Sequence, residues 1–454
     1  MALRSPPLLS LQQMAMVKLA VPVCNDPEVQ DLVIRSGSLS FVFPSKETEI
    51  FMNRSREQFE GSCANVFKPW TWNDFLINGS SKHSYRYCPE LKKRRVTLGK
   101  LRKGTLPFGE WEELVEKKMS SFMVPYFLRP KLLDLIRSVT VEIDIWIKDH
   151  SFILVHTAQS VRTAQSYFQW TSYGRIDRVK TARTLIIKDV LHIEDLYILA
   201  LHYGLMDDMF SDTNRNLAWK KLAEKEADFL ASGSTVTFVC KTFTGESDFN
   251  YIALRNFFSE STPDERVQCL NTVLSMDCLQ YEDLLFGLSK MDDNEKSAVF
   301  KTHPLKLLMY FLDWPLQSQF LDAAECLLSY FTETDFRVLL IFILYERIMV
   351  GWKDFDYIQL LKELWSRCPS PLKQCVTSED CVYDDLMYTV NYSNNAISPK
   401  EHLLESYDEI CLPFGYRGTQ YWIYNGENRG SVGLGEVSKP LAGHHRYVHE
   451  FYFC

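Results

Sequence analysis

The sequence predicts a mainly all-α protein, in which stacked short helices form an irregular α-solenoid or helical array. Three observations support this fold class. Helix signatures follow one another from about residue 189 to residue 410. Glycine is scarce, because the 454-residue chain contains 19 and seven of them lie in the last 43 residues. Apolar residues make up 46% of the chain, which is ample material for a hydrophobic core.

Residues 1–110 are expected to form an N-terminal helical module with a basic loop. Ser10 is a suitable N-cap for a helix that runs to Val21. Asp26 followed by Pro27 combines an N-cap with a proline at the first helical position, which predicts a second helix. The rest of this module carries scattered aromatic residues and turn formers, so we expect short helices and loops there.

The stretch from Val139 to Ile147 fits two kinds of secondary structure. Its apolar residues alternate strictly, which is the period of a strand. The same residues also continue a stripe with spacings of three and four that begins at Leu132. The stripe runs for about 16 residues, which is long for a strand, so we predict a helix. Residues 175–187 predict another helix.

Residues 111–411 are expected to form the helical array itself. Residues 194–203 are amphipathic and Gly204 follows them as a C-cap. Residues 214–230 carry one apolar face, which predicts a further helix. Two capping signatures begin at Thr262 and Ser398. The later helices are expected to centre near Leu308, Ala324, Leu340, Leu361 and Leu386.

Two segments resemble degenerate ankyrin repeats. In Leu196–Phe210, Ala200 and Gly204 match the frame of a first helix, a glycine and a second helix, although Leu201 replaces the second alanine. Gly351–Leu364 resembles the glycine and second helix of another unit. The T-P-L-H opening of ankyrin repeats is missing throughout. The resemblance implies a scaffold of stacked helical pairs and transfers no binding residues.

The last part of the chain, residues 412–454, differs in composition from the array. It is rich in glycine and aromatic residues and shows no helical period. We expect it to be either an extended segment packed on the last helices or a partly ordered end.

Composition excludes several functional classes. The net charge of −8 and the pI of about 5.8 argue against general nucleic-acid binding. The 12 cysteines include no C-x-x-C pair, which favours free thiols in a reducing compartment. No uninterrupted apolar run is long enough to span a bilayer. We therefore expect an intracellular protein, cytoplasmic or nuclear, with an unknown protein partner and without a membrane or nucleic-acid partner.

A basic cluster is the most distinctive local feature of the sequence. Closely spaced like charges favour an exposed, extended segment, which is typical of a nuclear-import signal or a basic binding patch. We favour a solvated loop, with nuclear import as the main alternative. The cluster consists of Lys92, Lys93, Arg94, Arg95, Lys100, Arg102 and Lys103.

The segment from Ser10 to Ala20 resembles the elongin-binding box of cullin-ligase substrate receptors. That box reads small residue, leucine, three residues, cysteine, three residues, aliphatic. Ser10, Leu11 and Leu19 fit, Ala15 replaces the cysteine, and no downstream L-P-x-P element is present. The same pattern is typical of an ordinary packing helix, which we favour.

Recognisable catalytic and phosphate-binding motifs are missing from the sequence. We therefore expect no catalytic, cofactor-binding or metal-binding residues. Three groups that could carry such chemistry have simpler structural explanations, as helix-terminal carboxylates, a surface histidine cluster and structural thiols. They are the pairs Asp207–Asp208, Asp292–Asp293 and Asp384–Asp385, the histidines His444, His445 and His449, and the cysteines Cys368, Cys375 and Cys381.

The sequence thus favours a non-enzymatic scaffold or adaptor for protein–protein interaction. A substrate-receptor-like subunit of a ubiquitin ligase is one alternative, and an all-helical enzyme without a recognisable motif is another. Trp314, Trp352 and Trp365 are the array residues to test for partner binding, although each is more typical of a core.

Overall fold

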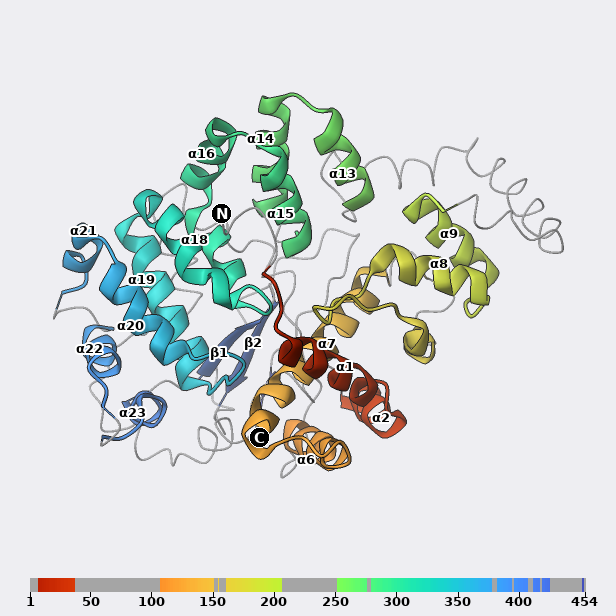
Figure 1. Ribbon diagram of the computed structural model, residues 1–454, viewed down its shortest axis with the longest axis horizontal. Helices are drawn as coiled ribbons and strands as arrows, with labels where there is room; N and C mark the ends of the chain where they lie inside the picture. The colour runs from red at the N-terminus through yellow and green to blue at the C-terminus, as the bar shows by residue number, and fades with distance from the viewer. Residues whose placement is uncertain are drawn as a thin grey trace, which may run out of the picture. The chain divides into compact units, whose positions relative to one another are not determined.

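The computed structural model is mainly α-helical, as the sequence predicts (Figure 1). The structure describes residues 7–36, 107–150, 154, 161–205, 251–275, 279–377, 382–393, 396–406, 411–416, 419–424 and 451–452. Within these ranges short helices follow one another, and the strands form one sheet of three. The predicted helix at 214–230 and the basic cluster at 92–103 lie outside the described residues.

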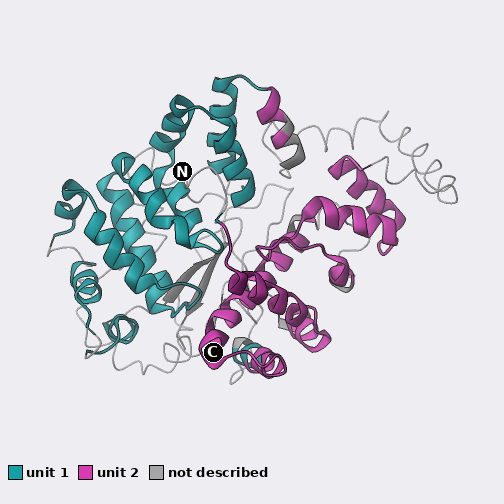
Figure 2. Ribbon diagram, in the orientation of Figure 1, with its two compact units in different colours: residues 1–7, 42–112, 261–454 teal, residues 8–41, 113–260 magenta. Residues whose placement is uncertain are grey.

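The chain divides into two compact units (Figure 2). Unit 1 contains Ser261–Cys454 together with Met1–Pro7 and Val42–Glu112, and unit 2 contains Leu8–Phe41 and Glu113–Glu260. The boundary between the units, at Ser261, therefore falls inside the 111–411 segment that the sequence predicts as one array. The boundaries at 110 and 411 that composition suggests stay predictions.

Unit 2 is built from helices, and α7 packs against α1, η3 and η4 within it. The helix α6 continues into this unit from its start at Pro107. The elements are α1 (Leu11–Cys24), α2 (Pro27–Ser36), α6 (Pro107–Ser120), η3 (Tyr126–Leu128), α7 (Arg129–His150), η4 (Val161–Tyr167), α8 (Arg178–Lys188), α9 (Ile193–Tyr203) and α13 (Tyr251–Glu260).

The helix α7 contains the stretch that also fitted a strand, so the helix prediction is confirmed. The alternation misleads because α7 is buried on several faces at once. Val139, Val141 and Ile143 are buried, and so are Thr140 and Glu142 between them. A helix that is enclosed in this way keeps apolar side chains on more than one face, which weakens the three-to-four spacing of a surface helix.

Local capping explains where several helices begin and end. The side chains of Ser10 and Gln13 form a capping box at the start of α1. The carboxylate of Asp26 accepts a hydrogen bond from the backbone N–H of Glu28 at 3.0 Å and caps α2. Gly204 ends α9 with a left-handed φ of 63°, which glycine adopts without strain. The predicted caps at Ser10, Asp26 and Gly204 are therefore confirmed, but α1 runs on to Cys24, past the predicted end at Val21.

Unit 1 is a series of short helices, most of which pack against neighbours that are near in sequence. Its capping box at Thr262 and Glu265 and its cap at Ser398 are both present, as predicted. The helical elements are α14 (Pro263–Ser275), α15 (Tyr281–Lys290), α16 (Asp293–Thr302), α17 (Pro304–Met309), η6 (Tyr310–Leu312), η7 (Gln317–Gln319), α18 (Phe320–Leu327), η8 (Leu328–Tyr330), α19 (Glu333–Ile341), η9 (Phe342–Met349), α20 (Tyr357–Arg367), α21 (Ser370–Gln374), α22 (Tyr383–Val390) and α23 (Pro399–Ser406).

The described strands lie near the C-terminal end of the chain. β1 (Cys411–Tyr416) and β2 (Thr419–Tyr424) form an antiparallel hairpin, and β3 (Phe451–Tyr452) adds a short parallel pairing to β2. β1 contacts η9, a π-helix of unit 1. The absence of a helical period after residue 412 therefore corresponds to extended structure in the described residues of this segment.

Candidate interaction surface

Exposed large apolar side chains are unevenly distributed between the two units. Among the side chains that the structure describes, ten large apolar ones are exposed, and only Ile397 belongs to unit 1. The other nine belong to unit 2. They are Leu8, Leu11, Ile34, Phe122, Met123, Tyr126, Phe127, Ile187 and Leu201.

Four of these side chains lie in the connection between α6 and α7, which we call the 122–127 loop. Met123 is 90% exposed, Tyr126 85%, Phe127 75% and Phe122 38%. Single exposed apolar residues are normal on a protein surface, but contiguous apolar patches mark interaction sites. Four within six residues make this loop the strongest candidate for a binding surface.

The 122–127 loop is held in place by hydrogen bonds and by one buried side chain. The backbone N–H of Phe122 donates to the carbonyl of Met119 at 3.1 Å. Val124 is buried, and its carbonyl accepts a hydrogen bond from Nε of Arg129 at 3.2 Å. Leu128 donates to the carbonyl of Pro125 at 2.9 Å and closes a single 3₁₀ turn. The exposed side chains are thus presented from a fixed backbone.

Met123 has a left-handed φ of 53°. This conformation costs a residue with a Cβ roughly 1 kcal/mol or more, and glycine is the usual residue at such helix ends. The position is therefore not optimised for stability, and its side chain projects into solvent.

An ion-pair cluster lies at the end of α6 beside this loop. Nζ of Lys118 is 2.8 Å from Asp26 Oδ2 and 2.8 Å from Glu28 Oε2. The hydrogen bonds to Asp26 and Glu28 raise the pKa of Lys118. Burial acts to raise the pKa of Asp26, but hydrogen bonds from Lys118 and from the Glu28 backbone hold it below its ordinary value. The cluster joins α6 to the turn between α1 and α2.

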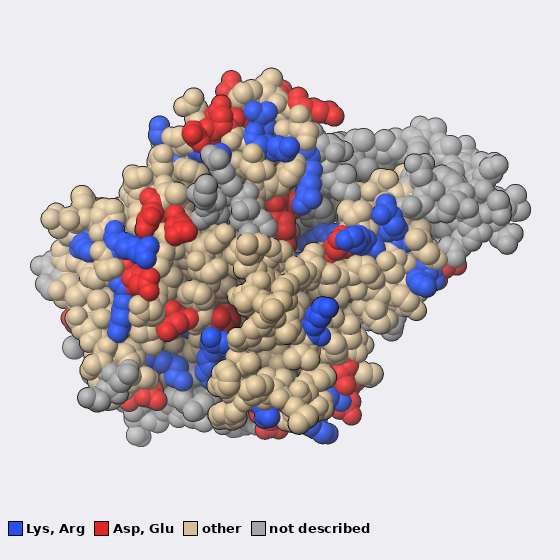
Figure 3. Space-filling model, in the orientation of Figure 1, with Lys and Arg blue, Asp and Glu red and all other residues tan. Residues whose placement is uncertain are grey.

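The helix α1 has one buried face and one exposed face. Its inner residues pack in the core, and Sγ of Cys24 donates to the carbonyl of Ile136 on α7 at 3.5 Å. Its outer face carries Leu11, which is 82% exposed, and Ala15, while Lys18 is the helix's one charged residue. Figure 3 accordingly shows a mostly uncharged surface over α1.

The residues of the elongin-box resemblance lie on this helix. Ser10 is its N-cap, and Leu11, Ala15 and Leu19 are spaced by four residues and therefore share one face. Leu11 and Ala15 are exposed, and Leu19 is half-buried. α1 packs on α7 through its other face, as the favoured interpretation expects, and Leu11 lies on the face that this packing leaves exposed.

The array tryptophans are mostly core residues. Trp314 and Trp352 are buried. Trp365 is half-buried, and its ring stacks near Phe336 with a centroid distance of 6.4 Å. Burial therefore argues against Trp314 and Trp352 as contact residues, whereas part of Trp365 stays accessible.

Two pairs of buried charged groups in unit 2 are engaged with each other. The carboxylate of Glu142 accepts from Nη1 of Arg175 at 2.9 Å and from the backbone N–H of Ile176 at 3.2 Å. Arg137 pairs with Asp134. These groups are almost completely buried, and their pairing holds α7 in the core.

One buried histidine also belongs to this core. Nε2 of His150 lies 2.7 Å from the hydroxyl of Tyr203, and its ring stacks on Trp146 at 3.8 Å. Burial, with the charges of Arg178 and His202, holds the pKa of His150 well below its ordinary value. The ring is therefore neutral at physiological pH and acts as a packing group.

Unit 1 contains a comparable buried network around Arg347. Nη2 of Arg347 lies 2.9 Å from Asp313 Oδ1, and its guanidinium covers the Phe342 ring. Asp354 accepts hydrogen bonds from Gln317 at 2.7 Å and from the Tyr357 hydroxyl at 3.3 Å. Burial, followed by the charge of Asp354, raises the pKa of Tyr357 well above its ordinary value. This network fixes η9 against its neighbours.

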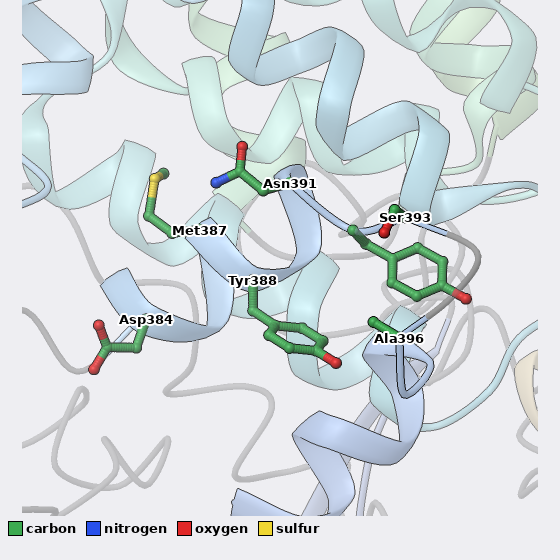
Figure 4. Close-up of a pocket in the computed structure, with 7 residues that line it drawn as sticks. Asp384, Met387, Tyr388, Asn391, Ser393 and Ala396 are labelled. Carbon is green, nitrogen blue, oxygen red and sulfur yellow. The ribbon is translucent and has the colours of Figure 1, made fainter.

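A pocket of about 380 Å³ lies beside α22 (Figure 4). Asp384 is its acidic lining residue, and it lies at the far end from Ser393 and Ala396. Tyr388 forms part of the wall, and its other side stacks on the ring of His402 at 3.8 Å. Apart from the tyrosines Tyr388 and Tyr392, the lining brings no second titratable side chain to this pocket.

The carboxylate of Asp385 on α22 contacts three donor side chains. It accepts a hydrogen bond from Tyr345 at 2.6 Å and one from Ser406 at 3.4 Å, and it lies 3.3 Å from Nε2 of His402. A catalytic chain would place the histidine between the hydroxyl and the carboxylate. Here the hydroxyl and the imidazole both contact the carboxylate, which is the arrangement of a structural anchor.

The remaining groups with possible chemistry are structural where they are described. Asp292 caps α16 by accepting from Asn294 and Glu295 at 2.8 and 2.9 Å, as predicted. Burial raises the pKa of the Cys368 thiol to about 12, and Cys375 is also a buried free thiol. Within the described ranges no group of His, Cys, Asp and Glu side chains could hold a metal ion. Asp207, Asp208, Cys381 and the three C-terminal histidines lie outside these ranges.

Comparisons with known proteins add no relative. Searches against protein-family models, curated proteins and solved structures find no significant match to this chain. The ankyrin-like resemblance of two segments therefore stays a prediction. None of the helices in the described part of the chain is long and apolar enough to cross a membrane.

Proposed function

We propose that this protein is a non-enzymatic scaffold for protein–protein interaction, and that it contacts its partner through the 122–127 loop. The observation that carries this proposal is the exposure of Phe122, Met123, Tyr126 and Phe127 on one short connection. Aromatic residues and methionine are enriched at protein interfaces, because they bury a large area on binding.

The fixed backbone of the 122–127 loop supports the same function. A binding segment that is already ordered loses less conformational entropy when the complex forms. The hydrogen bonds at Phe122, Leu128 and Arg129 order this loop before any partner arrives. Large side chains on such a backbone can therefore contribute most of their buried area to affinity.

The test compares two exposed apolar residues of unit 2. Phe127→Ser removes an apolar side chain of the loop, and Ile187→Ser removes one from α8 as a matched control. Both variants are expected to keep the melting temperature of the wild type, because neither side chain is buried. Co-purification with quantitative mass spectrometry is expected to show at least one protein that is lost from Phe127→Ser and retained by Ile187→Ser. Identical profiles would contradict the proposal.

A second candidate function is that of a substrate receptor in a ubiquitin ligase. Its support is the outer face of α1, where Leu11 is exposed at the leucine position of the elongin-box resemblance and Ala15 lies one turn further on. An elongin-binding helix has to offer this face to its partner, and a packing helix does not.

Purified elongin complex tests this second candidate directly. Leu8 and Leu11 are both strongly exposed, but only Leu11 occupies the box position. Binding by the wild type and by Leu8→Ser, with loss in Leu11→Ser, would support it. If the wild-type chain does not bind elongin, the substrate-receptor function is excluded.

We also propose that the protein acts inside the cell, in the cytoplasm or the nucleus, without a membrane or nucleic-acid partner. The support is the set of free thiols and the acidic net charge of −8. Two of these thiols, Cys24 and Cys269, lie in the core, where burial raises their pKa values to about 12 and about 11. Thiols of this kind pack as small apolar groups.

A further inference from the structure

The charges around the 122–127 loop have a single sign along the chain. Between Lys117 and Lys131 every charged residue is a cation, although the whole chain has a net charge of −8. The four cations of this segment are Lys117, Lys118, Arg129 and Lys131. An apolar tip is thus flanked by positive charge on both sides.

The four cations differ in how they are used. Lys118 is engaged by Asp26 and Glu28. Arg129 is half-buried and donates its Nε–H to the loop backbone. Lys117 and Lys131 are exposed, and neither forms an ion pair with the described residues. These two lysines are therefore available to a binding partner.

We propose that the partner presents an apolar groove whose rim carries carboxylates, and that these carboxylates pair with Lys117 and Lys131. This inference rests on the proposed function and adds the chemistry of the partner. The groove would receive the side chains of Met123, Tyr126 and Phe127, which project furthest into solvent. Complementary charges at the rim of an interface speed association and select the partner.

An anionic bilayer fits the same loop less well. An anionic membrane surface interacts electrostatically with every protein charge within a Debye length, which is about 8 Å at physiological ionic strength. Glu28 is 61% exposed next to Lys118, and Glu116 is exposed near the end of α6, beside Lys117. These carboxylates and the acidic net charge oppose adsorption to anionic lipid. A groove contacts only the loop tip and its nearest lysines.

The experiment uses the full-length chain and the protein that co-purifies with the wild type but not with Phe127→Ser. Affinity is measured by titration calorimetry at low and at physiological salt. Reversing the two lysines, Lys117→Glu with Lys131→Glu, is expected to weaken binding about tenfold at low salt and to flatten its salt dependence. Phe127→Ser is expected to weaken binding about 30-fold or more with an unchanged salt dependence.

Met123→Gly separates binding from folding. It is expected to raise stability, because glycine adopts the left-handed backbone without strain, and to weaken binding at the same time. A variant that binds worse while it is more stable cannot owe its defect to unfolding.

The outcomes distinguish the partner's chemistry from the function itself. Unchanged affinity of the lysine-reversed chain, with loss in Phe127→Ser, would overturn the acidic rim and leave the proposed function standing. Absence of any protein that depends on Phe127 would overturn both. Phe127-dependent binding to vesicles of phosphatidylcholine and phosphatidylserine would overturn the protein groove in favour of a lipid surface.

Discussion

Units 1 and 2 are both built from short helices around buried ion pairs, but they differ in what they leave at the surface. Unit 2 exposes nine large apolar side chains, and unit 1 exposes Ile397 alone among the described residues. Each unit pairs a buried arginine with a carboxylate, Arg175 with Glu142 in one and Arg347 with Asp313 in the other. Among the described residues, the difference lies in the exposed apolar side chains.

This comparison assigns different roles to the two units. A helical unit that hides its apolar residues gains solubility and loses the means to bind by burial of apolar area. The described residues of unit 1 follow that pattern. Unit 2 keeps an apolar loop on a fixed backbone, which is costly for solubility unless a partner covers it. We therefore expect mutations in unit 1 to act on stability and mutations at the 122–127 loop to act on binding.

The largest effect is expected from breaking the buried ion pairs. Glu142→Ala leaves Arg175 charged and enclosed, which should destabilise the protein by about 3–5 kcal/mol. Asp313→Ala should cost less, about 2 kcal/mol, because Asp313 is 20% exposed and water can solvate Arg347 in its place. Urea denaturation followed by circular dichroism measures both. A larger loss of stability for Asp313→Ala than for Glu142→Ala would contradict this ranking by solvent exposure.

A second prediction asks whether unit 2 exposes apolar residues because it packs loosely. Gly174 has φ +71°, and a Cβ placed there would lie 3.3 Å from a methyl group of Val139. Gly174→Ala should therefore cost about 2 kcal/mol through strain and crowding. Gly109→Ala is the control, since a Cβ there meets nothing within 4 Å, and it should stabilise helix α6 by up to about 1 kcal/mol. A negligible cost at Gly174 would indicate a loose core.

The third prediction concerns acid. Burial, followed by the charge of Lys306, lowers the pKa of His303 in unit 1 from 6.5 to about 4. The folded state then binds fewer protons than the unfolded state between these values, so stability that is present above pH 6.5 is lost as the pH falls toward 4. His303→Gln should remove about 1–2 kcal/mol of this pH dependence, allowing for partial exposure. Parallel slopes for variant and wild type would contradict this assignment.

The smallest effects are expected at the surface loop. Tyr126→Ser should change the free energy of unfolding by less than about 0.5 kcal/mol, because the side chain makes little contact with the core. Met123→Gly should stabilise the protein by about 1 kcal/mol. Thermal denaturation measures both. If Tyr126→Ser lowers the free energy of unfolding by more than about 1 kcal/mol, the loop packs in the core, and the proposed difference between the two units is wrong.

Much of the fold could be predicted because helix ends are decided locally. Ser10, Asp26, Thr262 and Gly204 act through hydrogen bonds or backbone conformation within a few residues, so their effect can be recognised in the sequence. The helical period of α7 was harder to recognise in the sequence. Its burial on several faces depends on neighbours far along the chain. The polar residues that complete its core, such as Glu142, find partners 33 positions away.

The candidate surface could not be predicted in this way. Phe122, Met123, Tyr126 and Phe127 have the composition of a core segment, and only their tertiary surroundings place them in solvent. The same limit applies to Leu11, whose exposure depends on how α1 packs on α7. Trp314 and Trp352 are the opposite case, since large aromatic residues suit both interfaces and cores, and here they are core.

Site-specific cross-linking tests the central claim most directly. A photoreactive phenylalanine analogue is placed at Phe127 in one full-length chain and at Ile397, the exposed apolar residue of unit 1, in another. After irradiation in native extract, we predict a discrete adduct from position 127 and none from position 397. Adducts from position 397 alone would contradict the claim that unit 2 carries the binding surface.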